Sequence, residues 1–487
     1  MASTVRPVAA GAGSHSCHRG IAERQASASP EMEREDTVNL FKVRSVAAAG
    51  ATALLVLLAV TAPMASAQVA TTGVQQIGLG VDPTHMANVG GTLFFAAGDS
   101  AHGRELWKSD GTSAGTKRVR DVRPGTGSSN PSGLTNVGGV LYFSANDGVH
   151  GRELWKSDGT LAGTKPVRDI RSGPKGSVPD NLTDVNGVLF FSANDGIHGN
   201  ELWKSNGTAA GTKLVRDLNP GSGGSELRFF LSHAGKLFFT QMPFGQVTDQ
   251  CPWISDGTAT GTRRISSGWH ACDAALPANV AGTLFFAVDA GLWRLNDVTE
   301  RAELVSAKPS GLGNLTNVAG TLFFGGYNAV SSQGLWKSDG TDDGTKLLKD
   351  VNPDIQTYPE WIAGAGTTAY FSIDDGVHGI ELWKSDGTHI GTVLVKDIAP
   401  GSTGGYPNDS DPYSPVAIGS TLYFVANDGT HGYELWKSDG SEVGTQRLTD
   451  INPSGSSNIG LVTRVGGTLF FNANDGVHGP RLWSYTP

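Results

Sequence analysis

The chain has 487 residues, of which 67 are glycine and 17% are charged, and its formal net charge is −9. So much glycine predicts many tight turns. The acidic balance argues against nucleic acid or anionic lipid as a partner, because both are bound through basic patches.

The N-terminal segment has the pattern of an export signal. An apolar run covers residues 46–62, follows Lys42 and Arg44, and precedes an Ala-Ser-Ala sequence that ends at Ala67. These features predict a secretory signal peptide cleaved after Ala67, and therefore a secreted or cell-surface protein. A retained membrane anchor is the alternative, because the run is at the short limit for a span.

The segment that precedes this run is longer than the usual N-terminal part of a signal peptide. Translation therefore starts either at Met1 or at Met32. In both cases we expect residues 1–67 to be an extension and signal, and residues 68–487 to be the folded domain, with no membrane span.

From residue 72 onward the chain repeats one unit. The phrase Glu-Leu-Trp-Lys-Ser-Asp-Gly-Thr, complete at residues 153–160, recurs in varied form at spacings of 40 to 53 residues. Such a period is typical of solenoids and propellers. The tryptophans of the nine phrases are Trp107, Trp155, Trp203, Trp253, Trp293, Trp336, Trp383, Trp436 and Trp483.

Each unit contains four short stretches with strand character, separated by Gly-Gly, Asp-Gly-x-His-Gly and Asp-Gly-Thr turn signals. The second and third stretches carry adjacent apolar residues, such as Phe190 and Phe191. Adjacent strand residues point to opposite faces, so both faces of each sheet must be buried. A radial stack of four-stranded sheets achieves this burial, which predicts an all-β propeller.

The two ends of the repeat region complement each other. The last unit stops at Pro487 after three of its four strands, whereas residues 72–78 match the fourth-strand pattern of residues 212–218. We therefore predict that the N-terminal strand completes the C-terminal blade and closes a nine-bladed ring without an exposed edge. Eight blades with one extruded unit, two smaller rings and an open arc remain alternatives.

The iterated phrase resembles the bacterial ELWxxDGT-repeat family over about residues 72–485. This resemblance implies a secreted or surface-exposed, propeller-like protein and no established reaction or ligand. Two units depart from the pattern. Cys251 and Pro252 replace Glu-Leu before Trp253, and residues 296–298 replace Asp-Gly-Thr after Trp293.

Most polar residues of the repeat have a structural interpretation. The nine tryptophans are expected in the core. The Asp of each Asp-Gly-Thr turn is expected to accept backbone hydrogen bonds within its own turn. A Gly-x-Ser-x-Gly match at residues 111–115 is not a hydrolase motif, because the position of Ser113 varies freely among the repeats. The turn aspartates are Asp110, Asp158, Asp256, Asp339, Asp386 and Asp439.

Six histidines share one register in the turn between the second and third strands. We expect each to pack on its own turn beside an Asp such as Asp147. Metal binding is the alternative, since His is a common ligand. The six are His102, His150, His198, His378, His431 and His478.

A few residues stand outside the repeat. Asp409 and Asp411 form a weak calcium candidate, and no other cofactor is predicted. Cys251 and Cys272 are expected to form a disulfide, with two free thiols as the alternative. Trp269 and Trp361 are candidates for an exposed aromatic platform.

These observations lead to a functional hypothesis. We expect an exported, monomeric, non-catalytic module that binds a protein or polysaccharide at the cell surface. The alternative is a secreted carbohydrate-active protein, either a lectin or a glycoside-processing enzyme, because propellers host both and fold alone does not decide.

Overall fold

The computed structural model describes residues 73–77, 81–243, 250–265, 274–288, 291–328, 333–352, 357 and 359–487. All of these belong to one compact unit, residues 68–487. In the described ranges every regular element is a strand, and no helix there is long and apolar enough to cross a membrane. The predicted signal peptide lies outside the described residues.

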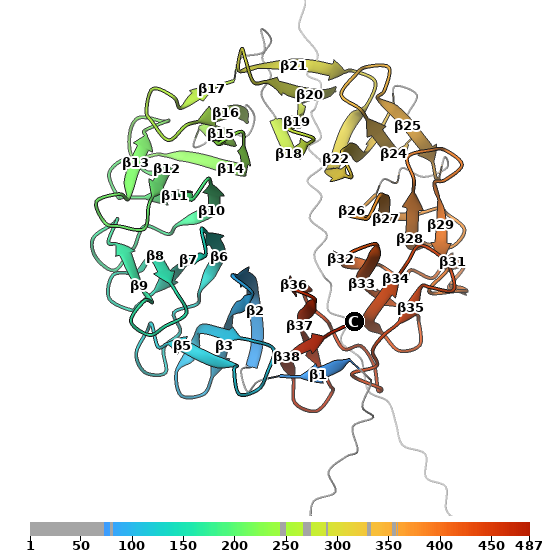
Figure 1. The fold of residues 1–487 in the computed structure, drawn as a ribbon, viewed down its shortest axis with the longest axis horizontal. Helices are drawn as coiled ribbons and strands as arrows, with labels where there is room; N and C mark the ends of the chain where they lie inside the picture. Colours follow the sequence, from blue (N-terminus) through green and yellow to red (C-terminus); the bar gives the residue numbers. More distant parts are fainter. Residues whose placement is uncertain are drawn as a thin grey trace, which may run out of the picture. The chain divides into compact units, whose positions relative to one another are not determined.

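Nine four-stranded antiparallel sheets are arranged as the blades of a β-propeller around a central opening (Figure 1). This confirms the predicted fold and blade count. The innermost strands, in blade order, are β2 (Val81–Val89), β6 (Ser132–Val137), β10 (Asp180–Val185), β14 (Ser225–His233), β18 (Ala274–Val280), β22 (Ser310–Val318), β26 (Ile362–Ala365), β32 (Tyr413–Ile418) and β36 (Thr463–Val465).

Three further strands complete each blade. The second strands are β3 (Thr92–Asp99), β7 (Val140–Asn146), β11 (Val188–Asn194), β15 (Lys236–Pro243), β19 (Thr283–Val288), β23 (Thr321–Tyr327), β27 (Thr368–Asp374), β33 (Thr421–Asn427) and β37 (Thr468–Asn474). The third strands, which carry the tryptophans, are β4 (Gly103–Ser109), β8 (Arg152–Ser157), β12 (Asn200–Ser205), β16 (Cys251–Ser255), β20 (Gly291–Asn296), β24 (Gln333–Ser338), β28 (Ile380–Ser385), β34 (Tyr433–Ser438) and β38 (Pro480–Tyr485). The outermost strands are β5 (Lys117–Arg120), β9 (Lys165–Arg168), β13 (Lys213–Arg216), β17 (Arg263–Arg264), β21 (Arg301–Ser306), β25 (Lys346–Asp350), β29 (Val393–Lys396), β35 (Gln446–Arg447) and β1 (Val74–Gln76).

A small hairpin of β30 (Ser402–Thr403) and β31 (Tyr406–Pro407) lies outside the blades, in the connection between the seventh and eighth.

The N-terminal strand closes the ring as predicted. β1 is the outermost strand of the ninth blade and pairs with β38, so that Val74 lies opposite Tyr485 and Gln76 opposite Trp483. The Ile77 amide continues this edge by donating to the Leu482 carbonyl at 2.8 Å. Ile77 itself is 2% exposed and packs between the ninth and first blades, which ties the two chain ends together.

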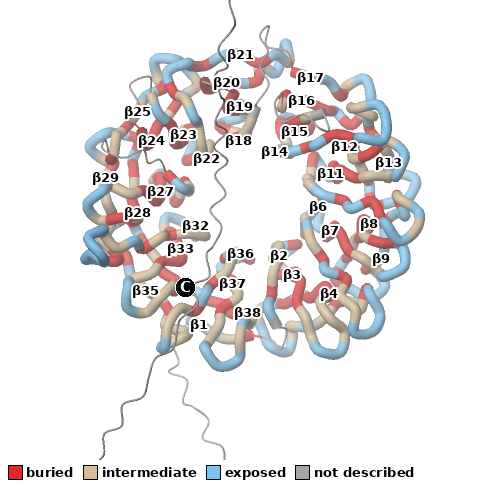
Figure 2. The backbone as a smooth tube through the Cα atoms, turned by 180° about the vertical axis from the view of Figure 1, so that it is seen from behind, coloured by how far each residue is buried: buried red, intermediate tan, exposed pale blue. Residues whose placement is uncertain are grey.

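The core consists of one apolar layer between each pair of neighbouring blades. Phe191 packs with Tyr142 of the preceding blade, whereas the adjacent Phe190 packs with Phe239 of the following blade. Figure 2 shows the result: buried positions run through the middle of every blade, and exposed positions gather in the outer turns. Both faces of each sheet are buried, as the adjacent apolar residues predict.

Candidate functional site

Seven of the nine repeat tryptophans are buried, including Trp155 at 4% exposure, while Trp253 and Trp293 of the divergent units are half-buried. The Trp155 ring lies beside Phe143, with ring centroids 6.4 Å apart. These contacts place the tryptophans in the core rather than on a binding surface.

The turn aspartates hold their own turns. One carboxylate oxygen of Asp158 accepts hydrogen bonds from the Thr160 amide at 2.9 Å and from the Thr160 hydroxyl at 2.7 Å. The Thr160 hydrogen bonds lower the pKa of Asp158. Asn206 makes the same two bonds to Thr208, so the turn needs the oxygen and not the charge. The same pair of bonds is made by Asp110, Asp256, Asp339, Asp386 and Asp439.

Each of the six histidines contacts the Asp three residues before it. His150 donates its backbone amide to Asp147 at 2.8 Å, and its ring Nδ1 lies 2.7 Å from the same carboxylate. The hydrogen bond to Asp147 raises the pKa of His150. The corresponding bonds to Asp195 and Asp375 raise the pKa values of His198 and His378. The ring-to-carboxylate distances are 2.7 to 2.9 Å at His102, His150, His198, His378, His431 and His478.

A buried glutamate in five of the nine blades was missed by the sequence interpretation. The five are Glu105, Glu153, Glu201, Glu381 and Glu434. Glu153 is 2% exposed, and its carboxylate accepts the amides of Ile170, Arg171 and Ser177 at 2.8 to 3.1 Å. Burial raises its pKa. The glutamate therefore anchors the loop that leads to the next blade. The sequence did offer a clue to this role, because the glutamate directly precedes the Leu-Trp pair in a strand whose two faces are both buried.

The predicted calcium residues have protein partners. Asp409 accepts the Ile380 amide at 2.7 Å, and Asp411 accepts the Tyr433 hydroxyl at 2.8 Å. Within the described ranges, no group of three or more His, Cys, Asp or Glu residues is placed to hold a metal ion. Calcium at this loop stays a prediction.

The other residues outside the repeat have different outcomes. Cys251 is buried and disulfide-bonded, whereas its predicted partner Cys272 lies outside the described residues, as does Trp269. Trp361 is half-buried, and its indole N–H donates to the Pro412 carbonyl. Trp361 also helps to line a cavity on the inner wall of the ring.

The inner wall has a repeated backbone irregularity. A β-bulge in the innermost strands contains a residue with positive φ, which favours glycine and asparagine, as at Gly133 and Asn181. In the two divergent blades this position holds Phe229 and Leu276, each with φ of 54°. Bulky side chains in this region are strained. The strain identifies these positions as functional candidates.

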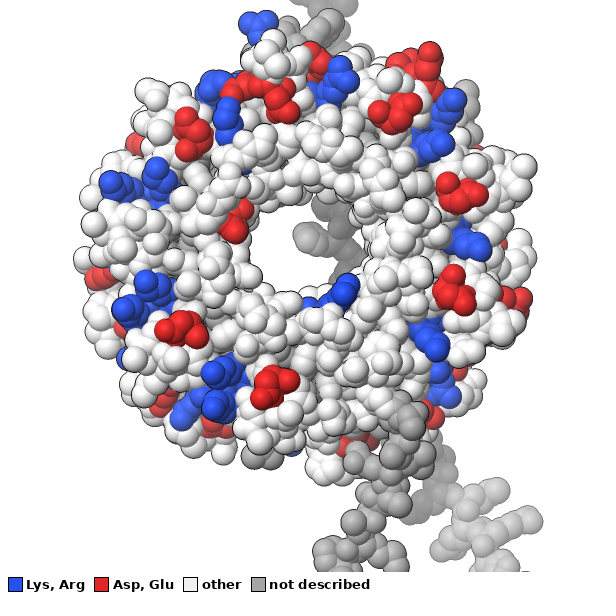
Figure 3. Space-filling model, in the orientation of Figure 1, with Lys and Arg blue, Asp and Glu red and all other residues white. Residues whose placement is uncertain are grey.

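Phe229 and Leu276 line a cavity of about 410 Å³ on the inner wall. The cavity spans β14, β18, β22 and β26, and Trp361 lies at its far end. None of its lining residues is charged. Figure 3 shows few charged side chains around the central opening. The cavity is therefore suited to an uncharged ligand.

The polar lining of this cavity offers acceptors. The Asn314 side-chain amide donates to the carbonyls of Pro359 and Glu360 at 2.8 and 2.9 Å. Among the residues that the structure describes, none donates to the Asn314 side-chain oxygen, which can therefore accept from a ligand. The Thr316 hydroxyl donates to the backbone carbonyl of Asn314 at 2.9 Å. The lone pairs of this hydroxyl can also accept a hydrogen bond from a ligand. A ligand with apolar faces and hydroxyl donors fits this surface.

The chain was compared with known proteins. No family model matches it, and no curated protein matches it. Solved structures with a similar fold include a prolyl endopeptidase, at 13% identity and a TM-score of 0.40 over 63% of this chain and 50% of that one. A puromycin hydrolase has 12% identity and a TM-score of 0.38 over 71% of this chain and 58% of that one. A xyloglucanase from Xanthomonas campestris has 13% identity and a TM-score of 0.30 over 83% and 82%.

These neighbours correct one expectation. The prediction that the chain is not an enzyme is contradicted, because the similar structures include a prolyl endopeptidase and a puromycin hydrolase. At such low identity the likeness shows the fold alone and transfers no reaction. The chain also spans only 50% and 58% of the lengths of those two proteins. The β-propeller scaffold is established by the nine four-stranded sheets of this chain itself.

Proposed function

We propose that this chain is an exported protein of the ELWxxDGT-repeat type that binds a neutral carbohydrate at the inner wall of its propeller. Export rests on the apolar run and the Ala-Ser-Ala sequence ending at Ala67. The observation that carries the binding proposal is the placement of Phe229 and Leu276 at strained positions that line one cavity.

The energetics support a functional role for these two residues. A left-handed backbone costs a bulky residue about 1–2 kcal/mol. Three counterparts, Gly133, Asn181 and Asn314, avoid most of this cost, whereas His85 and Ser414 hold the same position with polar side chains. Both bulky side chains are half-buried. A strained side chain that is only half-buried contributes little to the stability of the fold. Ligand binding therefore explains the presence of these two residues better than stability does.

The chemistry of the lining selects the ligand class. Sugar rings have apolar C–H faces and hydroxyl donors. The cavity provides the matching apolar surface at Phe229, Leu276 and Trp361, and acceptors at Asn314 and Thr316. An uncharged lining disfavours ionic ligands, because a buried charge needs a partner. A neutral polysaccharide at the cell surface meets these requirements.

A glycan array with and without calcium tests the proposal. The wild-type protein should bind neutral glycans, and Phe229→Asn should reduce that binding because it removes the apolar face and keeps a residue suited to positive φ. Asn181→Gly in the third blade is the matched control and should bind as the wild type does. Absence of neutral glycan binding, or equal binding by Phe229→Asn, would contradict the proposal.

A further inference from the structure

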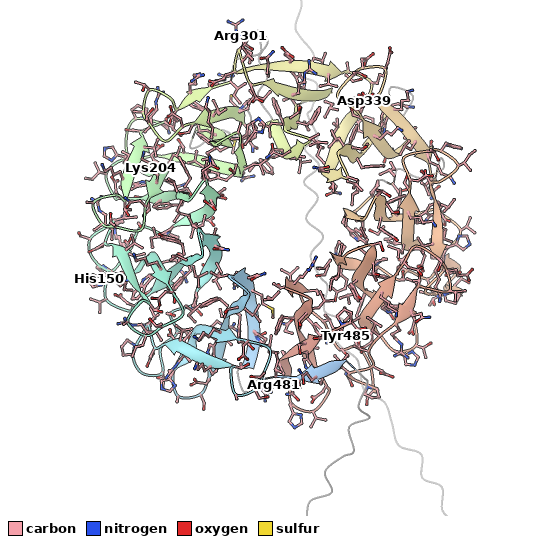
Figure 4. All side chains as sticks on the ribbon, in the orientation of Figure 1. His150, Lys204, Arg301, Asp339, Arg481 and Tyr485 are labelled. Carbon is pink, nitrogen blue, oxygen red and sulfur yellow. The ribbon has the colours of Figure 1, made fainter. Side chains whose placement is uncertain are left out.

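A second cleft lies on the outer part of the second blade, away from the inner wall. It occupies about 290 Å³ between the turn at Asp147 and His150 and the strand β9. Its lining consists of Asp147, His150, Glu153, Trp155, Pro166, Val167, Arg168 and Asp169. Figure 4 labels His150 on this outer side of the ring. Small-molecule pockets usually measure ~300–1,000 Å³, so this cleft is at the lower limit of that range. Its size suits one side chain of a partner.

The cleft lies where the repeat position opposite the tryptophan holds proline, a residue that differs among the blades. The outermost strand places one residue opposite the repeat tryptophan. In the second blade, Pro166 lies opposite Trp155. In the fifth blade the same position holds Leu304, which is exposed. In three other blades it holds a leucine that packs into the cluster of its own tryptophan. These are Leu214 beside Trp203, Leu347 beside Trp336, and Leu394 beside Trp383.

The fourth blade has Arg264 at the same position. The first and eighth blades also have arginine there. Arg118 lies opposite Trp107, and its Nη1 is 3.8 Å from Asp121. Arg447 lies opposite Trp436, and its Nη1 is 3.3 Å from Asp450. Asp121 and Asp450 are the counterparts of Asp169. In these blades, therefore, the protein's own guanidinium pairs with this carboxylate.

The eighth blade also shows how both carboxylates of the cleft can share one guanidinium. Arg447 Nε lies 3.7 Å from Asp428, the counterpart of Asp147, while Asp428 still contacts His431 at 2.8 Å. The histidine contact therefore does not prevent the arginine contact. Arg447 lies between the two carboxylates that correspond to Asp147 and Asp169.

The second blade has both carboxylates, and its residue opposite the tryptophan, Pro166, supplies no guanidinium. Arg168 also lines the cleft. Among the described residues Asp169 forms no hydrogen bond or ion pair, although its charge adds to the effect of Asp147 in raising the pKa of His150. The neighbouring Arg168 is already engaged, because its Nη1 donates to the Thr212 carbonyl at 2.6 Å and its guanidinium lies over the Trp203 ring of the next blade. Glu153 is committed to backbone amides, so Asp147 and Asp169 supply the charge.

We propose that this cleft binds the guanidinium of an arginine side chain on a partner protein. The partner's arginine would take the place that Arg118 and Arg447 take in their own blades, with its guanidinium between Asp147 and Asp169. A planar guanidinium donates in two directions to carboxylates, which an ammonium does less well. This site is independent of the carbohydrate site on the inner wall.

The test uses the full chain and a short peptide, acetyl-Gly-Arg-Gly-amide, titrated by NMR. Peptide binding in the millimolar range is expected for one side chain. The same peptide with citrulline in place of arginine should bind at least ~10-fold more weakly, because citrulline lacks the charge. Equal binding of the two peptides, or no binding of either, would overturn the proposal.

Variants locate the site. Pro166→Arg should abolish peptide binding by filling the cleft as Arg118 does, and Asp169→Asn should weaken it about 10-fold. Asp217→Asn is the matched control in the third blade, where Leu214 occupies the position, and should change nothing. If Pro166→Arg does not fold, Asp169→Asn still decides. Binding unaffected by Asp169→Asn, or equally weakened by Asp217→Asn, would refute the assignment.

Discussion

At the scale of single residues, most polar groups of the repeat stabilise the blade that contains them. The turn aspartates, the histidine–aspartate pairs and the buried glutamates all contact backbone groups or side chains of their own or the next loop. These contacts recur from blade to blade. Recurrence is what a structural role requires, whereas the residues that break it, Phe229, Leu276 and Pro166, mark the candidate sites.

The core tryptophans should dominate stability. Trp155→Ala is expected to lower the free energy of unfolding by ~3–5 kcal/mol, the usual cost of truncating a buried Trp. Trp253→Ala should cost less, because Trp253 is only half-buried. Urea denaturation measures both variants. An unchanged midpoint for Trp155→Ala would refute the core assignment.

The turn aspartates should act through their oxygen rather than their charge. Asp158→Ala removes the acceptor for both Thr160 bonds and should destabilise the protein by ~1 kcal/mol. Asp158→Asn should be nearly neutral, because Asn206 already forms the same turn. Urea midpoints of the two variants would be compared. Equal losses for both variants would show that the charge matters.

The buried glutamates should make stability depend on pH. Burial raises the pKa of Glu381 to about 7, above its ordinary value of 4.5. The folded state then binds more protons than the unfolded state between these values, so stability falls as pH rises through this window. The raised pKa of His378 acts in the same direction.

Melting temperatures should therefore be higher at pH 5.5 than at pH 8. Glu381→Gln should be less stable at both pH values, because one of its backbone partners faces an amide N–H₂, but its melting temperature should depend less on pH. A melting temperature that rises from pH 5.5 to pH 8, or an unchanged pH dependence in Glu381→Gln, would contradict this account.

At the scale of elements, the short strand β1 closes the ring by completing the ninth blade. It covers the edge of β38, which would otherwise present unpaired backbone groups to other molecules. It also leads into Ile77, which is buried against the first blade. Both chain ends therefore depend on one three-residue strand.

An engineered disulfide tests this pairing. Val74 and Tyr485 lie directly opposite each other, so Val74→Cys with Tyr485→Cys should cross-link, because facing residues of antiparallel strands have Cβ atoms ~4.5–5.5 Å apart. The mismatched pair Gln75→Cys with Tyr485→Cys should not, since adjacent strand residues point to opposite faces. Non-reducing electrophoresis distinguishes them. Equal cross-linking of both pairs would show that the register is wrong.

At the scale of the whole molecule, much of the fold could be predicted from the sequence. The blade count and the closure followed from nine tryptophan phrases and one spare strand at residues 72–78, because a strand without a partner must find one. The inner-wall cavity could not be predicted. It depends on bulges that rotate Phe229 and Leu276 into positive φ, and on Trp361 arriving from a blade much later in the chain.

The outer cleft was hidden for a different reason. Pro166 is one residue among several at its repeat position, and only the cross-strand register shows that it lies opposite Trp155. The guanidinium positions of Arg118 and Arg447 then show what is missing. Sequence comparison gives the variation, but three-dimensional contacts give its consequence.

We infer that Phe229 and Leu276 are retained for a ligand and not for the fold. The melting temperature of the double variant Phe229→Asn with Leu276→Asn tests it most directly. Asparagine tolerates positive φ, so release of about 1–2 kcal/mol of strain at each site should offset the lost apolar burial. We therefore expect an unchanged or higher melting temperature. A fall of more than about 3 °C would contradict it, because these side chains would then be part of the core.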